Sequence, residues 1–368
     1  MFIAPFGELG GAEMFLLRLT QALDERFEPR ALVLTPGFLP DGLRDTGVPT
    51  AVMKLPGKQA FLRFPAVARR QATSLQGAGI SFIHANQAKA AMLGALVAPQ
   101  LGVPLLWMKH DHILDGRPSR ALASRCDRVV CVSQAMAAQF RSQLGDRVSV
   151  VYPGVVVPSE VQPLGEQPHV VAVGRLDPAK GWVELLEAVA LLRRRGIDAR
   201  VTVAGPPDRI FPEHGDELRE LAARLGIAEH SHIGLVDDLG DLYDQAAVVA
   251  LASRERPSGA PSEGAPTVLM EAMAHGRPVV APREAGITEV VGEAGTLVAP
   301  RTAPAFADAL EPYLRDRVLA AETGRRGRER AKRLFAFEHT LGQLTSLYLE
   351  LAALSGAASR RRGDRAGA

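Results

Sequence analysis

The residues best suited to chemistry lie in a stretch that carries two glutamates eight positions apart. It runs from Glu263 to Glu271 and contains Pro266 and Thr267, which are typical of a helix start. Glu263 is expected in the preceding loop and Glu271 in the second turn, with uncapped backbone N–H groups between them. These amides can face a phosphate, while the carboxylates can accept hydroxyl protons from a sugar and a ribose. The stretch predicts a nucleotide-sugar site; a solvated helix start is the simpler interpretation.

A second stretch, from Gly174 to Gly181, joins an apolar run to a helix expected to start near Trp182. It carries Arg175 and Lys180. Arginine offers a planar fork of donors and lysine a movable point charge, so the pair can neutralise a diphosphate whose charge grows as it departs. Two basic residues in a loop are also compatible with ordinary solvated surface.

A third stretch, from Gly7 to Glu13, follows the first apolar run and contains the paired glycines Gly10 and Gly11. Paired glycines allow close approach to the backbone, and the free N–H groups of a helix start favour an anion. A simple tight turn is the alternative. The stretch lacks the G-x-G-x-x-G spacing of dinucleotide-binding enzymes, so an NAD-dependent oxidoreductase is disfavoured.

The fourth stretch, Lys109 to His112, follows another apolar run. Its alternating histidines lack a clear third and fourth ligand, so an orienting or electrostatic role for His110 is favoured over a metal site. The sequence contains no Asp-x-Asp pair to hold a divalent ion against a diphosphate. We therefore expect no metal and no cofactor, with cations of the protein neutralising the donor substrate.

The elements that must position these residues are short apolar runs that alternate with amphipathic stretches. This pattern predicts parallel strands joined by right-handed crossovers, with helices on both faces of each sheet. The expected strands are Arg30 to Thr35, Ile80 to Ala85, Pro104 to Met108 and Arg128 to Ser133, then His169 to Gly174, Arg200 to Gly205, His232 to Leu235, Val248 to Ala252 and Pro278 to Ala281. A first strand over Met1 to Pro5 is short, which favours a native start codon upstream.

The two series of strands predict two domains. Residues 1–158 form the first, on the acceptor side, and residues 166–335 form the second, which binds the nucleotide sugar. Between them, Val155 to Pro168 is rich in proline and has no helical periodicity, so it is a linker. An amphipathic helix over 338–355 needs a surface to cover, and the arginine-rich residues 356–368 are expected to form a disordered basic tail.

The bulk composition excludes several functional classes. With 368 residues, 47% apolar residues and a net charge of only +2, the chain is a globular protein rather than a nucleic-acid binder driven by charge. No apolar run is long enough to span a bilayer, and no signal peptide precedes the first strand, so a cytoplasmic location is expected. Cys126 and Cys131 fit a buried strand better than a disulfide.

One stretch leaves membrane contact open. Lys58 to Arg70 mixes apolar and basic residues, as a helix lying on a membrane surface does, and it equally fits a helix that covers the first domain. In the first case the protein would sit at the inner face of the membrane and use a lipid-linked acceptor.

Taken in order, these motifs resemble retaining glycosyltransferase family four. The likeness spans nearly the whole chain and rests on Gly-Gly-Ala-Glu at 10–13, on Gly-Arg-Leu and Lys-Gly within 174–181, and on the Glu-x7-Glu of 263–271. It implies an α/β architecture of two facing Rossmann-like domains, the GT-B type, with a cleft between them and a C-terminal helix that returns to the first domain. It also implies a retaining, metal-independent transfer of a hexose.

The resemblance implies roles residue by residue. Arg175 and Lys180 would bind the diphosphate, Glu263 the hydroxyls of the transferred sugar, Glu271 the ribose, and His110 the sugar near its reacting face. The implied catalytic residues are His110, Arg175, Lys180 and Glu263. The implied donor-binding residues are Gly10, Gly11, Gly174, Arg175, Lys180, Glu263, Gly264, Ala265, Pro266, Thr267, Val268 and Glu271.

The chain also departs from the family. The loop from Ser253 to Ser262 is longer than usual, and its Arg254, Arg256 and Gly259 are candidates for reshaping the donor pocket. Ala265 replaces a bulkier residue. Asn86 and Lys109 occupy strand ends where family members vary, so donor and acceptor stay open.

The sequence therefore predicts a glycosyltransferase that moves a sugar from a nucleotide diphosphate donor to a glycan, a lipid-linked sugar or a small metabolite. Two other functions stay open. One is a nucleotide-sugar epimerase or a phosphorylase on the same scaffold, since a fold does not determine a reaction. The other is a non-catalytic nucleotide-sugar-binding protein, which the complete set of charged residues disfavours.

Overall fold

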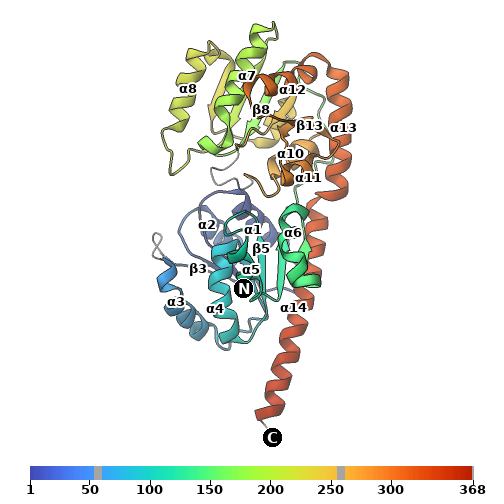
Figure 1. Cartoon of the computed structure of the whole chain (residues 1–368). Helices are drawn as coiled ribbons and strands as arrows, with labels where there is room; N and C mark the ends of the chain where they lie inside the picture. Colours follow the sequence, from blue (N-terminus) through green and yellow to red (C-terminus); the bar gives the residue numbers. More distant parts are fainter. Residues whose placement is uncertain (54–59, 255–261, 367–368) are drawn as a thin grey trace. The chain divides into compact units, whose positions relative to one another are not determined.

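A computed structural model describes residues 1–53, 60–254 and 262–366 of the chain. The chain forms two compact units, and Figure 1 labels some of their helices and strands. Unit 1 contains Met1–Gly154 and Glu338–Ala368, and unit 2 contains Val155–Phe337. Unit 2 is thus one continuous segment, whereas unit 1 needs both ends of the chain.

Unit 1 is built on a parallel sheet of seven strands in the order β3-β2-β1-β4-β5-β6-β7. The strands are β1 (Phe2–Ala4), β2 (Ala31–Val33), β3 (Thr50–Val52), β4 (Ile83–Asn86), β5 (Leu105–Lys109), β6 (Arg128–Cys131) and β7 (Val148–Val150). The helices are α1 (Gly11–Ala22), α2 (Phe38–Asp45), α3 (Ala60–Leu75), α4 (Ala88–Leu101), α5 (Arg117–Ala123), α6 (Gln134–Leu144) and α14 (Phe337–Ala366), with a short 3-10 turn η1 (Gly145–Arg147).

Unit 2 is built on a parallel sheet of six strands in the order β10-β9-β8-β11-β12-β13. The strands are β8 (His169–Val173), β9 (Arg200–Ala204), β10 (Ser231–Gly234), β11 (Val248–Ala250), β12 (Val279–Pro282) and β13 (Gly295–Val298). The helices are α7 (Trp182–Arg194), α8 (His214–Arg224), α9 (Leu239–Gln245), α10 (Thr267–Ala274), α11 (Ala285–Val291), α12 (Ala303–Arg315) and α13 (Arg317–Leu334), with 3-10 turns η2 (Pro178–Lys180) and η3 (Ala228–His230).

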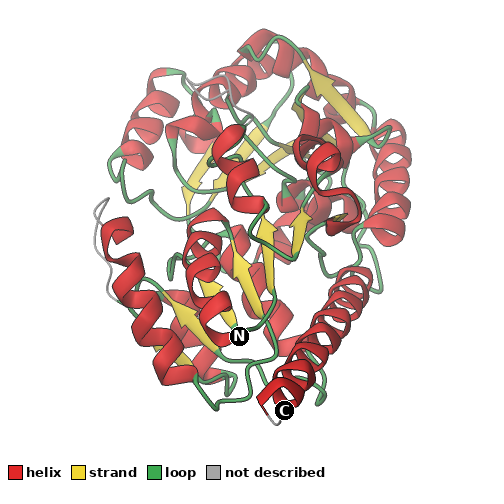
Figure 2. Cartoon of the chain, turned by 60° about the horizontal axis from the view of Figure 1, so that its bottom comes forward, coloured by secondary structure: helices red, strands yellow, loops and turns green. Residues whose placement is uncertain are grey.

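Both sheets are parallel throughout and covered by helices, as the apolar strand sequences require (Figure 2). The β5 run from Leu105 to Lys109, for example, is buried at every position. Each strand order reverses once, between β1 and β4 in unit 1 and between β8 and β11 in unit 2. The expected α/β class with two Rossmann-like units is confirmed.

Three strands escaped the sequence analysis: β3, β7 and β13. All three lie at the edge of a sheet, where one side has no neighbouring strand. β3 and β7 are only partly buried or exposed at each position. An edge strand needs no continuous apolar run, so its sequence carries little signal.

The last helix continues further than expected. α14 extends to Ala366, so the prediction of a disordered tail from residue 356 is corrected for the backbone up to that point. Within unit 1, Tyr348 of α14 is fully buried, and its hydroxyl lies 2.6 Å from Nδ1 of His84 in β4. Its ring stacks on Phe82 with ring centroids 4.9 Å apart. The amphipathic face of α14 therefore completes the unit 1 core.

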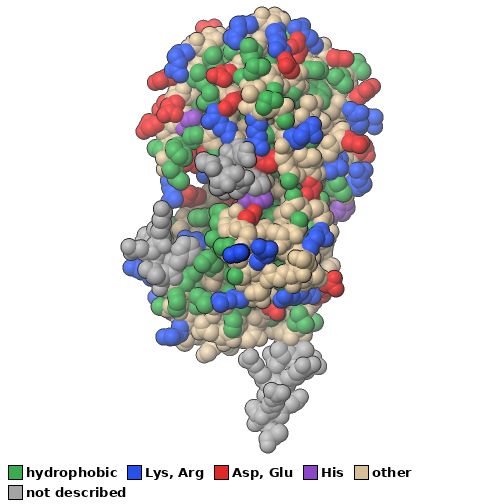
Figure 3. Space-filling model, viewed as in Figure 1, with side chains coloured by type: hydrophobic (Ala, Val, Ile, Leu, Met, Phe, Trp, Pro, Cys, Tyr) green, Lys and Arg blue, Asp and Glu red, His purple; other side chains and the backbone are tan. Residues whose placement is uncertain are grey.

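Helix α3 contains most of the stretch that could either lie on a membrane surface or cover the first domain. Its apolar residues Phe64, Val67, Ala68 and Ala72 are buried in unit 1. For this described part of the stretch, the structure therefore supports a covering helix; Lys58 lies outside the described residues. No described helix is long and apolar enough to span a bilayer. Figure 3 shows basic and acidic side chains interspersed on the visible face.

The cysteines behave as the sequence predicts. Cys126 and Cys131 are buried and form no disulfide. Burial raises the pKa of each thiol to about 12. Both thiols therefore stay protonated and act as small core residues.

Candidate active site

The candidate site of unit 2 lies at the carboxyl ends of β8 and β11, the neighbouring strands between which the strand order reverses. Open α/β sheets bind ligands at such reversal points. The loop after β8 is the Gly174–Gly181 stretch, and the chain after β11 leads through Ser253 to Glu263. Two of the predicted motifs, far apart in sequence, thus start from adjacent strand ends.

The two motifs meet through their charged side chains. Lys180 Nζ lies 2.6 Å from Glu263 Oε1, and the Ser253 hydroxyl donates to the same oxygen at 2.7 Å. The Lys180 and Glu263 side chains are 23% and 16% exposed. The carboxylate is therefore oriented by a cation and a hydroxyl while a part of both charged groups still faces solvent.

Close backbone packing holds the two loops together. Gly181 has a φ of +70°, and a Cβ at this position would lie 1.9 Å from the carbonyl oxygen of Ala252. Only glycine fits such an approach and such a backbone conformation without strain. The Asp177 carboxylate accepts from the Ala179 N–H at 2.8 Å, and the Arg254 N–H donates to the Ala179 carbonyl at 2.7 Å.

Arg175 lies on the same loop but has other partners. Its Nη1 donates to Asp208 Oδ2 at 2.6 Å, and Asp208, in the loop after β9, is almost fully buried. Half of the Arg175 side chain is exposed. The Trp182 indole donates to the Arg175 carbonyl at 3.0 Å, which ties the loop to the core. The structure thus joins Lys180 to Glu263 and Arg175 to Asp208.

Helix α10 begins where the sequence predicts. Pro266 is its N-cap, it contains Thr267 and Val268 in its first turn, and no side chain caps it. The Leu269 N–H donates to the Pro266 carbonyl at 3.2 Å. The N–H groups that precede it have no acceptor four residues back within the helix, and such a helix start favours an anion. Gly264 and Ala265 precede it, and Gly286 of α11 packs so closely that a Cβ there would lie 2.2 Å from the Gly264 carbonyl oxygen.

Glu271 lies in the second turn of α10, and the Tyr243 hydroxyl of α9 donates to its Oε2 at 3.0 Å. Burial, together with the nearby Glu271 carboxylate, raises the pKa of Tyr243 well above its usual value. The phenol therefore stays protonated and remains a donor to the carboxylate. Tyr243 fixes the orientation of the glutamate that the sequence assigns to the ribose.

In unit 1, His110 follows β5 and is held by the end of β4. Its Nε2 lies 2.7 Å from Asn86 Oδ1, while Asn86 Nδ2 donates to the Ala12 carbonyl at 3.1 Å. Burial lowers the pKa of His110 to about 3. The neutral ring therefore donates from Nε2 to Asn86, and its Nδ1 is a hydrogen-bond acceptor.

Gly10 and Gly11 lie at the start of α1, with Gly10 as N-cap. A Cβ on Gly10 would lie 2.5 Å from Oε2 of Glu13, so the glycine makes room for this buried carboxylate. The other oxygen, Oε1, accepts from Gln87 at 2.9 Å. The Glu13 carboxylate would repel a phosphate bound at this helix start, whereas a hydroxyl group there could donate a hydrogen bond to it.

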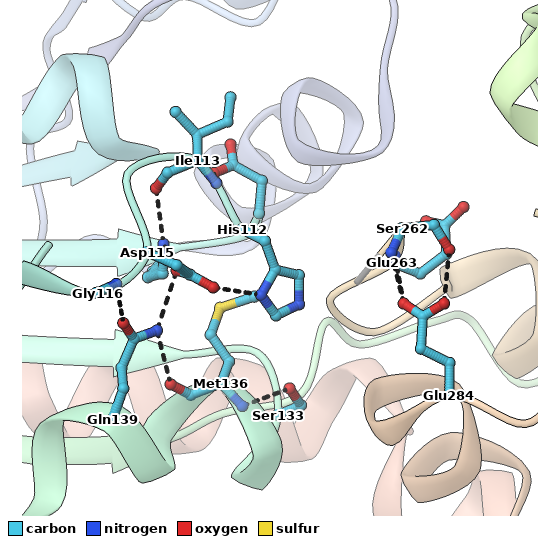
Figure 4. Close-up of polar contacts among 12 residues, drawn as sticks. His112, Ile113, Asp115, Gly116, Ser133, Met136, Gln139, Ser262, Glu263 and Glu284 are labelled. Carbon is cyan, nitrogen blue, oxygen red and sulfur yellow. Dashed lines mark hydrogen bonds and ion pairs between the residues drawn. The ribbon is translucent and has the colours of Figure 1, made fainter. Parts of the chain in front are cut away.

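The remaining polar residues of the β5 loop form a separate network (Figure 4). Lys109 is fully buried and pairs with Asp115 at 2.8 Å, and His112 Nδ1 lies 2.6 Å from the same carboxylate. Although burial alone would raise it, hydrogen bonds from His112, Lys109 and Gln139 lower the pKa of Asp115 to about 2. Among the described residues, no group of three or more histidines, cysteines or carboxylates is placed to hold a metal ion.

Each predicted site residue lies in one unit or the other. Gly10, Gly11 and His110 belong to unit 1, and the Gly174 to Lys180 and Glu263 to Glu271 stretches belong to unit 2. In the long loop after β11, Arg256 and Gly259 lie outside the described residues, while Arg254 pairs with Glu184.

Sequence analysis missed four residues that form hydrogen bonds with the predicted site residues: Ser253, Asp208, Tyr243 and Glu284. Ser253 and Glu284 lie within three residues of the ends of β11 and β12, and Asp208 lies in the loop after β9. Inspection of every strand end for single polar residues, rather than for motifs, would have found these three. Tyr243 lies within a helix, and no local signal marks it.

Two family models match the chain. The model described as Glycosyltransferase Family 4 matches residues 9–157, and the model described as Glycosyl transferases group 1 matches residues 167–316. Together they cover the greater part of both units.

Proteins with similar sequences are named as glycosyltransferases. A GDP-mannose-dependent alpha-(1-6)-phosphatidylinositol monomannoside mannosyltransferase of Mycobacterium tuberculosis is 33% identical over 57% of this chain and 58% of its own length. A D-inositol 3-phosphate glycosyltransferase of Salinispora tropica is 30% identical over 77% of this chain and 67% of its own length. The chain thus aligns with little more than half of the mannosyltransferase.

Solved structures share the fold. HepE of Anabaena in complex with UDP and glucose has a TM-score of 0.77 and 22% identity, covering 94% of this chain and 98% of HepE. Sucrose-phosphate synthase of Thermosynechococcus elongatus has a TM-score of 0.79 and 21% identity, with 96% and 98% covered. At this identity the likeness concerns the two-unit architecture alone.

Proposed function

Because the chain belongs to glycosyltransferase family 4, we propose that it transfers a sugar from a nucleoside diphosphate sugar to an acceptor, with retention at the anomeric carbon and without a metal ion. The observation that carries this proposal is the Lys180–Glu263 contact of 2.6 Å at the carboxyl ends of β8 and β11. It joins the cation suited to a diphosphate to the carboxylate suited to a sugar.

In this proposal unit 2 binds the donor. Arg175, Lys180 and the uncapped start of α10 lie where they can stabilise the charge that grows on the departing diphosphate. Glu263 accepts hydroxyl protons of the transferred sugar, and Glu271, oriented by Tyr243, accepts those of the ribose.

Unit 1 supplies acceptors for hydroxyl groups. The neutral His110 offers Nδ1, because Asn86 occupies its Nε2. At the start of α1, the Glu13 carboxylate next to Gly10 favours a sugar hydroxyl over a phosphate. His110, Gly10 and Gly11 therefore act on the sugar or on the acceptor in this proposal.

The names of the relatives select the first substrates to try. GDP-mannose and UDP-glucose are the first donors, and inositol phosphates and phosphatidylinositol mannosides are the first acceptors. We propose that the enzyme acts in the cytoplasm, where such nucleotide sugars are made.

The test is a turnover screen of the full chain against a panel of nucleotide sugars, with and without acceptor and with and without EDTA. We expect acceptor-dependent release of one nucleoside diphosphate that EDTA does not abolish, and NMR should show the donor's anomeric configuration in the product. An inverted product would refute retention. Interconversion of free nucleotide sugars without acceptor would instead support an epimerase, and binding without turnover a non-catalytic protein.

A further inference from the structure

A partly buried ion pair is hydrogen-bonded to the main chain of Glu263 and is formed by residues that no motif contains. Glu284 follows β12 and Arg301 follows β13, and Arg301 Nη2 donates to Glu284 Oε2 at 2.8 Å. The Glu284 side chain is only 8% exposed. A carboxylate so far from water needs its partners, because an uncompensated buried charge is costly.

Glu284 binds the main chain that precedes α10 in the sequence. Its carboxylate accepts from the Glu263 N–H at 3.3 Å, from the Ser262 N–H, and from the Ser262 hydroxyl at 3.0 Å. Figure 4 shows Glu284, the N-cap of α11, pointing toward Ser262 and Glu263. Together with Arg301, four donors converge on this one carboxylate.

Arg301 binds the main chain that follows β11. Its Nη1 donates to the Ser253 carbonyl at 3.3 Å. The Ser253 hydroxyl in turn donates to Glu263 Oε1 at 2.7 Å. One ion pair therefore fixes the main chain of Glu263 and the main chain of the serine that orients its carboxylate.

We propose that Glu284 and Arg301 are positioning residues that set the direction of the Glu263 carboxylate and thereby determine which configuration of sugar hydroxyls the donor site accepts. This inference rests on the proposed function. It concerns the transferred sugar and not the nucleotide, because Glu284 and Arg301 bind the main chain at Ser253, Ser262 and Glu263. Arg175 is held instead by Asp208, and Glu271 by Tyr243. A displacement of about 1 Å can cost on the order of 100-fold in rate when a positioned group is involved.

The test compares the full-length wild type with Glu284→Gln, which keeps the shape of the side chain and removes its charge. Two measurements are needed: kcat and KM for the best donor and for a donor that differs in the configuration of one sugar hydroxyl, and the Kd of the nucleoside diphosphate by calorimetry. We expect the ratio of kcat/KM between the two donors to fall about tenfold or more. We expect the Kd to stay within about twofold, because the diphosphate and ribose contacts are elsewhere.

Two further variants make the result specific. Arg301→Lys keeps the charge but loses the fork that reaches both Glu284 and Ser253, so its selectivity should lie between that of Glu284→Gln and that of the wild type. Glu311→Gln is the matched control, since Glu311 also bridges two arginines, Arg195 and Arg315, but on helix α12. It should keep the selectivity of the wild type.

Unchanged donor selectivity in a folded Glu284→Gln protein would overturn the proposal, and so would a parallel loss of nucleoside diphosphate binding. If Glu284→Gln does not fold, Arg301→Lys decides by the same two measurements. A wild-type chain that turns over no donor would instead contradict the proposed function itself, and with it any role in sugar selectivity.

Discussion

At the scale of single residues, the two cations of the proposed donor site have different carboxylate partners. Lys180 pairs with Glu263, and Arg175 pairs with Asp208. Each cation is thereby held in place with part of its side chain exposed. A cation that is oriented before the substrate binds needs little reorganisation as charge develops on the leaving group.

Replacement of either cation should therefore slow transfer strongly. For Arg175→Ala and Lys180→Ala we expect kcat to fall by about 10²- to 10³-fold, the usual cost of losing one such donor. Steady-state release of nucleoside diphosphate is the measurement. Arg224→Ala, on the exposed side of α8, is the control and should retain wild-type turnover. Near-normal turnover of both site variants would refute their role.

At the scale of elements, the position of the loop between β8 and α7 depends on the close packing of Gly181 against the Ala252 carbonyl. Gly181 and Gly226 have nearly the same left-handed φ, +70° and +71°, but only the first lies against another strand end. The two glycines thus separate backbone strain from steric overlap.

We expect Gly226→Ala to cost about 1 kcal/mol of unfolding free energy, from backbone strain alone. Gly181→Ala should cost clearly more and also reduce kcat, because its Cβ would collide with the Ala252 carbonyl and displace the loop that carries Lys180. Denaturant unfolding and turnover of both variants test this. Equal loss of stability with unchanged kcat in both would show that the approach does not position Lys180.

Helix α14 is attached to unit 1 through Tyr348. Tyr348→Phe leaves the buried His84 Nδ1 without its partner, so we expect a loss of about 1 to 3 kcal/mol in unfolding free energy. Its neighbour Leu349 is largely exposed, and Leu349→Ala should cost less than about 0.5 kcal/mol. Denaturant titrations compare the two. A Tyr348→Phe protein as stable as the wild type would mean that the hydrogen bond contributes nothing net.

At the scale of the whole molecule, the two units should respond differently to acid. Burial lowers the pKa of both His84 and His110 in unit 1 from 6.5 to about 3. Between these values the unfolded chain binds more protons than the folded chain, so the unfolding free energy falls as the pH falls. The slope is up to about 1.4 kcal/mol per pH unit for each histidine.

The chain contains only two tryptophans, one in the core of each unit, and these allow the test. Trp182→Phe leaves Trp107 to report on unit 1, and Trp107→Phe leaves Trp182 to report on unit 2. Burial also lowers the pKa of His169 in unit 2, so both units should lose stability in acid. Fluorescence-detected unfolding from pH 7 to pH 5 should show the larger loss for unit 1, which contains two such histidines. Equal slopes for both reporters would contradict this assignment.

Local sequence patterns were sufficient to predict the class of fold and the family, whereas the roles of the site residues stay predictions. Apolar runs indicated the central strands, because buried parallel strands must be apolar on both faces. The Gly174–Gly181 and Glu263–Glu271 stretches indicated a nucleotide-sugar site, since each depends on a strand end or helix start that is encoded within a few residues. The family then follows from motifs whose order is a property of the sequence.

Only the tertiary structure decided which partner each of these side chains has. Glu263 is oriented by Lys180, Ser253 and Glu284, which come from three different strand ends. Such contacts depend on strand order and on how closely two loops pack, and no local pattern of residue types specifies either. Three edge strands escaped prediction for the same reason, since their pairing depends on neighbours distant in sequence. The helical spacing did predict that Tyr348 lies on a covered apolar face, but not that its hydroxyl meets His84.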